Sequence, residues 1–168
     1  LGYGESDVTP REYTIAEYAA SIISFMDAMN VRRAHILGHH AGALIALEMA
    51  LSHPERASSL ILSALPCRKN AAESLARLEL PEMQRIEVQW DGSHLMDYWE
   101  RANRFGESVQ VCNERALDYF KAGPRGEEMH WSAFKYHAFP KLSQIKCPVL
   151  LLCGSKDWLM PGTELAQA

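Results

Sequence analysis

The sequence predicts an α/β fold built on a parallel sheet. Residues 59–63 and 148–153 are apolar along their length rather than at alternate positions, which is typical of interior strands covered on both faces. A third apolar run, residues 34–37, ends at a glycine. Helix-like segments alternate with these runs in the order helix, strand, helix, strand, and later strand, helix. We therefore expect a parallel sheet with helices on both faces.

Length and composition restrict the class of protein. The chain has 168 residues, of which 48% are hydrophobic and 23% are charged, and this is typical of one folded domain. No apolar run approaches the roughly 20 residues that cross a bilayer, so we expect no membrane partner. The net charge is −4, and lysines and arginines are scattered. We therefore expect no nucleic-acid partner either.

The cysteines predict a reducing compartment. None of the four has the spacing of a metal-binding motif, and no basic leader with an apolar stretch opens the chain. We expect free thiols and a cytoplasmic location. The four positions are Cys67, Cys112, Cys147 and Cys153.

A helix is expected to follow Thr14. Thr14 and Glu17 have the spacing of a capping box, in which each side chain satisfies an amide at the helix start. Apolar residues then recur at intervals of three and four up to Asn30, a residue suited to a left-handed stop. The expected buried stripe consists of Ile15, Tyr18, Ala19, Ile22, Ile23, Phe25, Met26 and Met29.

The next two elements meet at a glycine-flanked turn. The run at residues 34–37 leads into Gly38, as a strand leads into a tight turn. Nearly every residue from 41 to 51 is apolar, Glu48 is the lone charge, and Pro54 lies just beyond. This pattern predicts a helix that is buried on most sides.

Residues 66–140 interrupt the alternation of helices and strands. The stretch reads as mainly helical and is too long for a plain connection, so we expect a helical subdomain inserted into a core made of residues 1–65 and 141–168. Ten of the fifteen aromatic residues lie between Trp90 and Phe139. They are either the core of this helical unit or a lid that faces a ligand.

The five residues 38–42 read Gly-His-His-Ala-Gly. They lie between an expected strand and an expected helix, which is the setting of a nucleophile elbow with the pattern Gly-x-Ser-x-Gly. In such a turn the central residue is strained and its side chain is exposed above the sheet. Small residues on either side allow strand and helix to approach.

With this turn, the sequence resembles the α/β-hydrolase family. Residues 1–7 are similar to the loop after the family's fourth strand, and residues 52–56 are similar to the end of the elbow helix. Residues 154–157 follow an apolar strand where the family commonly places its acid. The resemblance covers nearly all of the chain and implies that residues 66–140 form a helical cap.

The sequence also departs from the family pattern. His40 stands where the family usually has Ser, or Asp or Cys in some branches. The resemblance places the family's catalytic histidine after an eighth strand, and one oxyanion-hole loop before Leu1, so that only the Ala41 amide of that hole is represented. We therefore expect this chain to be a piece of a longer protein, and to be inactive by itself.

His40 and Asp157 are the candidate catalytic residues. An imidazole at the elbow acts as a general base on water or as a nucleophile that passes through an acyl-imidazole. Asp157 is expected to orient His40 or its neighbour, the alternative being a carboxylate that caps a turn or a helix. The candidate substrate-binding residues are His39, Ala41, Trp99, Trp131 and Trp158.

We expect neither a metal nor a cofactor. His39 and His40 are adjacent and have no carboxylate at ligand spacing, and adjacent residues rarely point at one ion. Two functions remain open for the full-length parent. One is hydrolysis of a small apolar ester-like substrate, and the other is a catalytically silent protein that binds a ligand or a partner through the same cavity.

The small number of strands predicts unsatisfied sheet edges. The edges at residues 34–37 and 149–153 present backbone groups that need hydrogen-bond partners. We expect them to be paired with another copy of the chain in a homo-oligomer, or to be shielded by displaced helices.

Overall fold

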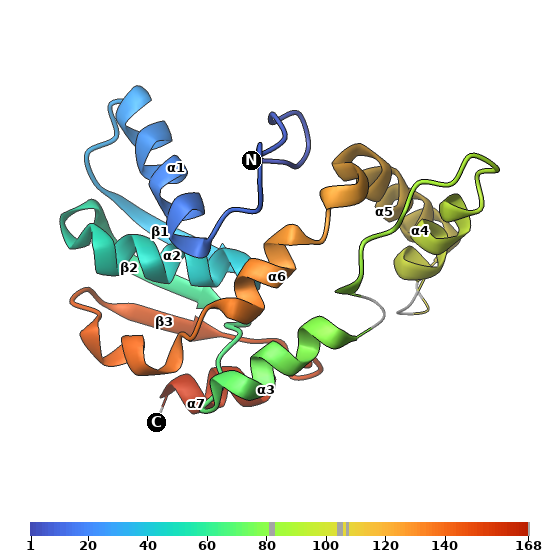
Figure 1. The fold of residues 1–168 in the computed structure, drawn as a ribbon. Helices are drawn as coiled ribbons and strands as arrows, with labels where there is room; N and C mark the ends of the chain where they lie inside the picture. The colour runs from blue at the N-terminus through green and yellow to red at the C-terminus, as the bar shows by residue number, and fades with distance from the viewer. Residues whose placement is uncertain (81–82, 104–105, 107, 168) are drawn as a thin grey trace.

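The computed structural model describes residues 1–80, 83–103, 106 and 108–167, and it has the predicted α/β architecture (Figure 1). The helices and strands follow in the order α1 (Ile15–Ala28), β1 (Ala34–His39), α2 (Ala41–Ser52), β2 (Ala57–Ser63), α3 (Ala71–Leu75), α4 (His94–Asn103), α5 (Val109–Ala122), α6 (Glu128–Lys135), β3 (Val149–Leu152) and α7 (Met160–Gln167). Short 3-10 turns are η1 (Pro54–Arg56), η2 (Ala76–Glu79), η4 (Gly123–Arg125) and η5 (Phe139–Gln144).

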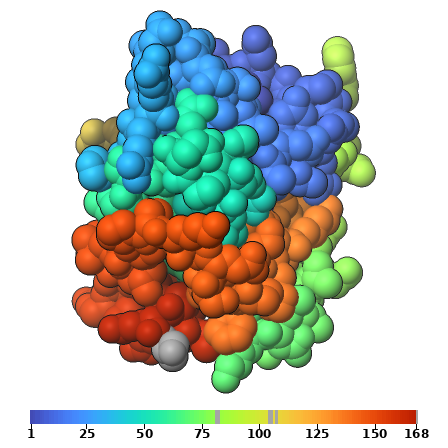
Figure 2. All heavy atoms as spheres, turned by 90° about the vertical axis from the view of Figure 1, so that its left-hand side faces the viewer, coloured from blue at the N-terminus to red at the C-terminus, as the bar shows by residue number. Residues whose placement is uncertain are grey.

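The three strands form one parallel sheet in the order β1-β2-β3. His39 pairs with Ser63, and Ser63 pairs with Leu152, so all three strands end at the same edge of the sheet. Figure 2 shows segments from the N-terminal third (blue to green) packed directly above C-terminal segments (orange and red). The sheet thus combines two strands from residues 34–63 with one strand from residues 149–152.

Helix α1 begins as predicted and buries a narrower stripe than predicted. The Thr14 amide donates to the Glu17 carboxylate at 2.8 Å, the Glu17 amide donates to the Thr14 hydroxyl at 3.2 Å, and Asn30 is left-handed with φ 56°. The buried residues of the helix are Ile15, Tyr18, Ala19, Ile23 and Met26. The prediction was wrong for Ile22, Phe25 and Met29, which are exposed. Successive residues of a helix are rotated by about 100° around its axis, so these three lie beside the stripe that packs on α2. None of the described residues covers them.

Helix α2 is the centre of the core. Its buried residues are Ala43, Leu44, Ala46, Leu47, Met49 and Ala50. The lone charge, Glu48, accepts hydrogen bonds from the Tyr136 hydroxyl at 2.6 Å, the Lys141 ammonium at 3.0 Å and the Ser52 hydroxyl at 2.9 Å. A carboxylate is tolerated in this apolar helix because it is fully hydrogen-bonded.

No helix in the described parts of the chain is long and apolar enough to cross a membrane.

Only one face of the sheet is covered. Helices α1 and α2 pack on the face that carries Leu60 and Leu62. On the opposite face, the side chains of Leu37, Leu150 and Leu152 are 65%, 51% and 45% exposed. The expectation that helices cover both faces is therefore wrong for the described residues, because the helices that contact the sheet all lie on the α2 side or at its end.

The described part of residues 66–140, the range expected to form an inserted subdomain, is mainly helical, and α4 and α5 project away from the sheet (Figure 1). Tyr98 of α4 packs against Tyr119 and Phe120 of α5, with ring centroids 6.2 and 5.2 Å apart. Trp90 is fully exposed. Some of the aromatic residues therefore form the core of the helical unit, and others face solvent.

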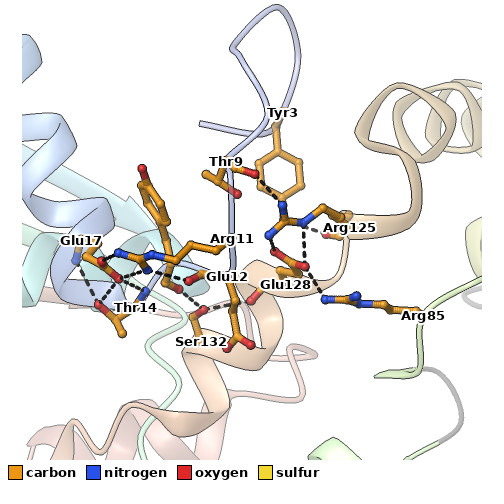
Figure 3. A network of polar contacts seen from close by, with 12 residues as sticks. Tyr3, Thr9, Arg11, Glu12, Thr14, Glu17, Arg85, Arg125, Glu128 and Ser132 are labelled. Carbon is orange, nitrogen blue, oxygen red and sulfur yellow. Dashed lines mark hydrogen bonds and ion pairs between the residues drawn. The ribbon is translucent and has the colours of Figure 1, made fainter.

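A buried carboxylate joins the N-terminal segment, residues 83–90 and α6 (Figure 3). The Glu128 side chain, only 3% exposed, accepts from Arg85 at 2.6 Å and from two nitrogens of Arg125 at 2.8 and 2.6 Å. Arg125 also donates to the Thr9 carbonyl at 2.6 Å. The Ser132 hydroxyl of α6 donates to the Tyr13 carbonyl. These contacts fasten α6 to the segment that precedes α1.

Candidate active site

His40 lies at the corner between β1 and α2. Its backbone has φ 50° and ψ −120°, a conformation that is strained for any residue other than glycine. The His40 amide donates to the Ser63 carbonyl at 3.0 Å, and the His40 carbonyl accepts from the Ala43 amide at 2.9 Å. The predicted strand, sharp turn and helix are thus all present, and the strain is held by hydrogen bonds to β2 and α2.

The two glycines of the turn have different roles. A Cβ atom on Gly38 would lie 2.1 Å from the Gly42 carbonyl oxygen and 2.7 Å from the Ala43 Cα. A Cβ atom on Gly42 would meet nothing within 4 Å. The expectation that both positions need a small residue is therefore correct for Gly38 and wrong for Gly42. The backbone of Gly42 lies close to Gly38 of the strand, whereas the space that a side chain of residue 42 would occupy is open.

The turn after β3 brings Asp157 to His40. The Nε2 atom of His40 lies 3.1 Å from Oδ2 of Asp157, and their side chains are 39% and 17% exposed. The other carboxylate oxygen accepts from the Leu159 amide at 2.9 Å. Asp157 thus serves both uses that the sequence left open, because one oxygen holds His40 and the other caps the turn before α7.

The environment of Asp157 favours its ionised form. Partial desolvation raises the pKa of the Asp157 carboxyl, but the Leu159 amide and the His40 imidazole lower it by more, so the pKa lies below its ordinary value. A carboxylate facing Nε2 favours the tautomer with the proton on that nitrogen. In that tautomer of the neutral ring, Nδ1 is the nitrogen without a hydrogen.

Two aromatic rings flank His40. The His39 ring stacks on it, with centroids 4.1 Å apart and an interplanar angle of 25°, and the His39 Nδ1 atom lies 3.0 Å from the Ser63 hydroxyl. The Trp158 ring meets His40 edge-on at 6.4 Å. On the other side, the guanidinium carbon of Arg77 lies 5.1 Å from the centre of the Trp158 ring.

The structure brings together some of the predicted binding residues and not others. Ala41 is the first residue of α2, where the amides of a helix lack a partner within the helix. Trp131 instead donates from its ring nitrogen to the Met83 carbonyl at 2.7 Å. Trp99 belongs to α4, which packs on α5. A substrate-binding role for Trp99 and Trp131 stays a prediction.

Sequence reasoning missed Ser63 and Arg77. Ser63 reaches the site through the register of β2 with β1, and Arg77 reaches it through the placement of η2 beside the turn after β3. Neither residue belongs to a sequence motif, so no local signal marked it. Among the described residues, no group of three His, Cys, Asp or Glu side chains is arranged to hold a metal ion.

Comparison with known proteins identifies the family. The family described as "alpha/beta hydrolase fold" matches residues 1–168, the whole chain. The chain belongs to the α/β-hydrolase fold family. In that family the corner occupied here by His40 is the nucleophile elbow.

Several relatives of this chain carry hydrolase names. A protein of Pseudomonas syringae pv. syringae named "Putative carbamate hydrolase RutD" is 28% identical over 170 residues, which cover 97% of this chain and 65% of the relative. A protein of the same name from Caulobacter sp. (strain K31) is 40% identical over 157 residues, which cover 89% of this chain and 57% of the relative. The chain therefore spans about two thirds or less of the length of these relatives.

Solved structures agree on the α/β-hydrolase fold. The enol-lactonase from Burkholderia xenovorans LB400 matches with a TM-score of 0.73 and 20% identity, covering 98% of this chain and 64% of the lactonase chain. A hydrolase from Pseudomonas aeruginosa PA01 matches with a TM-score of 0.73 and 22% identity, covering 98% and 63%. At these identities the likeness shows the fold alone.

Proposed function

We propose that the full-length protein containing this chain hydrolyses a small ester-like substrate, with His40 as the general base that activates water. The observation that carries this proposal is the contact between His40 Nε2 and Asp157 Oδ2, 3.1 Å long, at the corner where the family places its nucleophile. Relatives that carry the name "Putative carbamate hydrolase RutD" support a substrate with a carbonyl carbon. No cofactor takes part in the proposed reaction.

The proposed reaction follows from the hydrogen bonding of His40. Asp157 holds the Nε2 proton, and Nδ1 takes a proton from water as the water oxygen attacks the carbonyl carbon. The carbonyl oxygen gains a negative charge beside the Ala41 amide at the start of α2, where backbone donors favour an anion. The imidazolium then returns its proton to the leaving group, so that an acid and an alcohol, or an acid and an amine, are released.

A second function, binding without catalysis, is favoured by the identity of the elbow residue. His40 offers neither the hydroxyl, the thiol nor the carboxylate that forms covalent intermediates in many enzymes of this kind. A protein of this type would hold a ligand or partner beside His40 and leave it unchanged. A cytoplasmic setting belongs to both proposals and is supported by the four free cysteines.

Turnover of a panel of aryl esters, lactones and carbamates by the full-length protein tests the first function. The His40→Ala variant is expected to lose about 10²- to 10⁴-fold in kcat, the usual contribution of a positioned general base. The matched control is His53→Ala, because His53 lies at the far end of α2. The 168-residue chain alone is expected to be inactive.

Two results would decide between the functions. Turnover by His40→Ala equal to that of the unaltered protein would contradict the proposed role of His40. A full-length protein that turns over none of the panel, yet gains thermal stability from one of its compounds, would support binding without catalysis.

A further inference from the structure

Arg77 is an unusual arginine in this chain. It lies in the short turn η2 and is half-buried, with its guanidinium stacked on the Trp158 ring at 5.1 Å. Among the residues that the structure describes, no carboxylate lies within ion-pair distance of the Arg77 side chain, and the guanidinium makes no hydrogen bond. The cation therefore lies against an aromatic ring and has no counter-ion within the described part of the chain.

Two other arginines that lie over aromatic rings have a different arrangement. Arg85 lies over the Trp131 ring at 5.0 Å and is also ion-paired with Glu128. Arg11 lies over the Tyr13 ring at 5.2 Å and is also ion-paired with Glu17. A guanidinium has five donors in a planar fork that fits a carboxylate. At Arg77 the stacking restricts the side chain, and this fork is left for a group from outside the chain.

The position of Arg77 connects it to the candidate active site. The Trp158 ring that holds the guanidinium also contacts His40 edge-on at 6.4 Å, and Trp158 directly follows Asp157 in the chain. Trp158 as a whole residue is 49% exposed and the His40 side chain is 39% exposed, so a small molecule has access to both. The Trp158 ring would thus separate an anion bound by Arg77 from His40, the proposed base.

We propose that Arg77 binds an anionic group of the substrate. The substrate class is then a small carboxylic acid derivative that carries a carboxylate or similar planar anion in addition to the carbonyl carbon that water attacks. The guanidinium binds the anion through two parallel hydrogen bonds, and this places the carbonyl beside His40. The attack itself rests on the proposed function, whereas the binding of the anion does not.

Binding of malonate tests the anion site without any chemistry. Isothermal titration calorimetry of the full-length protein compares malonate with its uncharged dimethyl ester. Malonate is expected to bind, and Arg77→Gln is expected to weaken this binding about 10- to 100-fold, the usual effect of losing a charge-assisted hydrogen-bonded pair. Arg77→Lys should restore part of it. Arg32→Gln is the matched control, because it removes the same charge just before β1, at the opposite end of the sheet.

Turnover of a matched pair of esters tests specificity. The full-length protein is expected to prefer p-nitrophenyl hemisuccinate, which is anionic, over p-nitrophenyl acetate, which is neutral. Arg77→Gln should raise KM for the anionic ester about 10-fold or more with little change in kcat, and should leave the neutral ester unaffected. A variant that lost both esters equally would show that Arg77 supports the fold rather than the choice of substrate.

The two assays separate the two proposals. Arg77-dependent binding of malonate with no turnover of either ester or of any compound in the panel would support the anion site and overturn the hydrolase proposal. Turnover without preference for the anionic ester, together with malonate binding that is absent or unaltered in Arg77→Gln, would overturn the anion site.

Discussion

The backbone of His40 shows how a single residue is forced into a strained position. Its left-handed conformation is disfavoured by about 1 kcal/mol or more in any residue with a side chain, and the hydrogen bonds of its amide and carbonyl to Ser63 and Ala43 hold it there. The same geometry directs the imidazole to Asp157. At this scale, the backbone of the corner decides where the side chain of residue 40 lies.

The corner also predicts unequal effects of alanine at its two glycines. Gly38→Ala is expected to lower the free energy of unfolding by about 1–3 kcal/mol or more, because its Cβ atom would meet backbone atoms that have no room to move. Gly42→Ala is expected to leave the free energy of unfolding unchanged or to raise it, since its Cβ atom meets open space and alanine favours a helix. Urea unfolding measures both, and equal losses in the two variants would contradict this account of the corner.

At the scale of elements, α6 is the support of the inserted segment. Glu128 at its start is nearly inaccessible and is shared by Arg85 and Arg125, which come from the segment before α4 and from the turn η4. Two arginines from separate elements thus depend on one carboxylate. The placement of these elements on α6 is therefore electrostatic as well as apolar.

Glu128→Gln should loosen this part of the molecule. The substitution leaves two guanidinium groups beside a neutral amide. We expect it to lower the free energy of unfolding by about 3 kcal/mol, which is the lower part of the range for breaking a buried ion pair. The lower part applies because the Arg85 side chain is half exposed. The control is Glu5→Gln, which breaks the exposed pair with Lys121 and should cost less than about 1 kcal/mol.

Limited proteolysis gives a second readout of the Glu128→Gln variant. Cleavage within residues 83–125 should become faster than in the unaltered protein, since this segment is no longer fastened to α6. Unchanged cleavage rates combined with an unchanged free energy of unfolding would show that the Glu128 contacts do not support the inserted segment.

At the scale of the whole molecule, the described residues leave an apolar face and two edges of the sheet uncovered. Leu37 and Leu150 lie on opposite sides of Ile61 in register, and both are exposed. Strands β1 and β3 are the two edges. Exposed apolar surfaces and unpaired strand edges favour association in general, and we propose that this face takes part in it.

We expect the 168-residue chain to self-associate in solution. Light scattering should show a dimer or a larger species, and Leu37→Lys should shift the population towards the monomer, because a buried ammonium at an interface is unfavourable. Phe25→Lys is the control, since Phe25 is equally exposed but lies on α1, away from the open face. A strictly monomeric unaltered chain would contradict the expected association.

The sequence by itself determined the elements and the corner between them. Capping by Thr14 and Glu17, the left-handed Asn30 and the glycine-flanked turn at His40 all depend on contacts between residues close in the chain, and such contacts leave a local pattern. The pairing of His40 with Asp157 was foreseen through the resemblance to the α/β-hydrolase family, although 117 residues separate the two.

Only the tertiary structure decided which surfaces are covered and what surrounds His40. The exposure of Ile22 and Phe25 depends on which flank of α1 meets α2, and periodicity alone does not specify this. Ser63 and Arg77 reach His39 and Trp158 through strand register and through the packing of a distant turn. Such long-range contacts depend on how complete elements pack against one another, so they leave no mark in the nearby sequence.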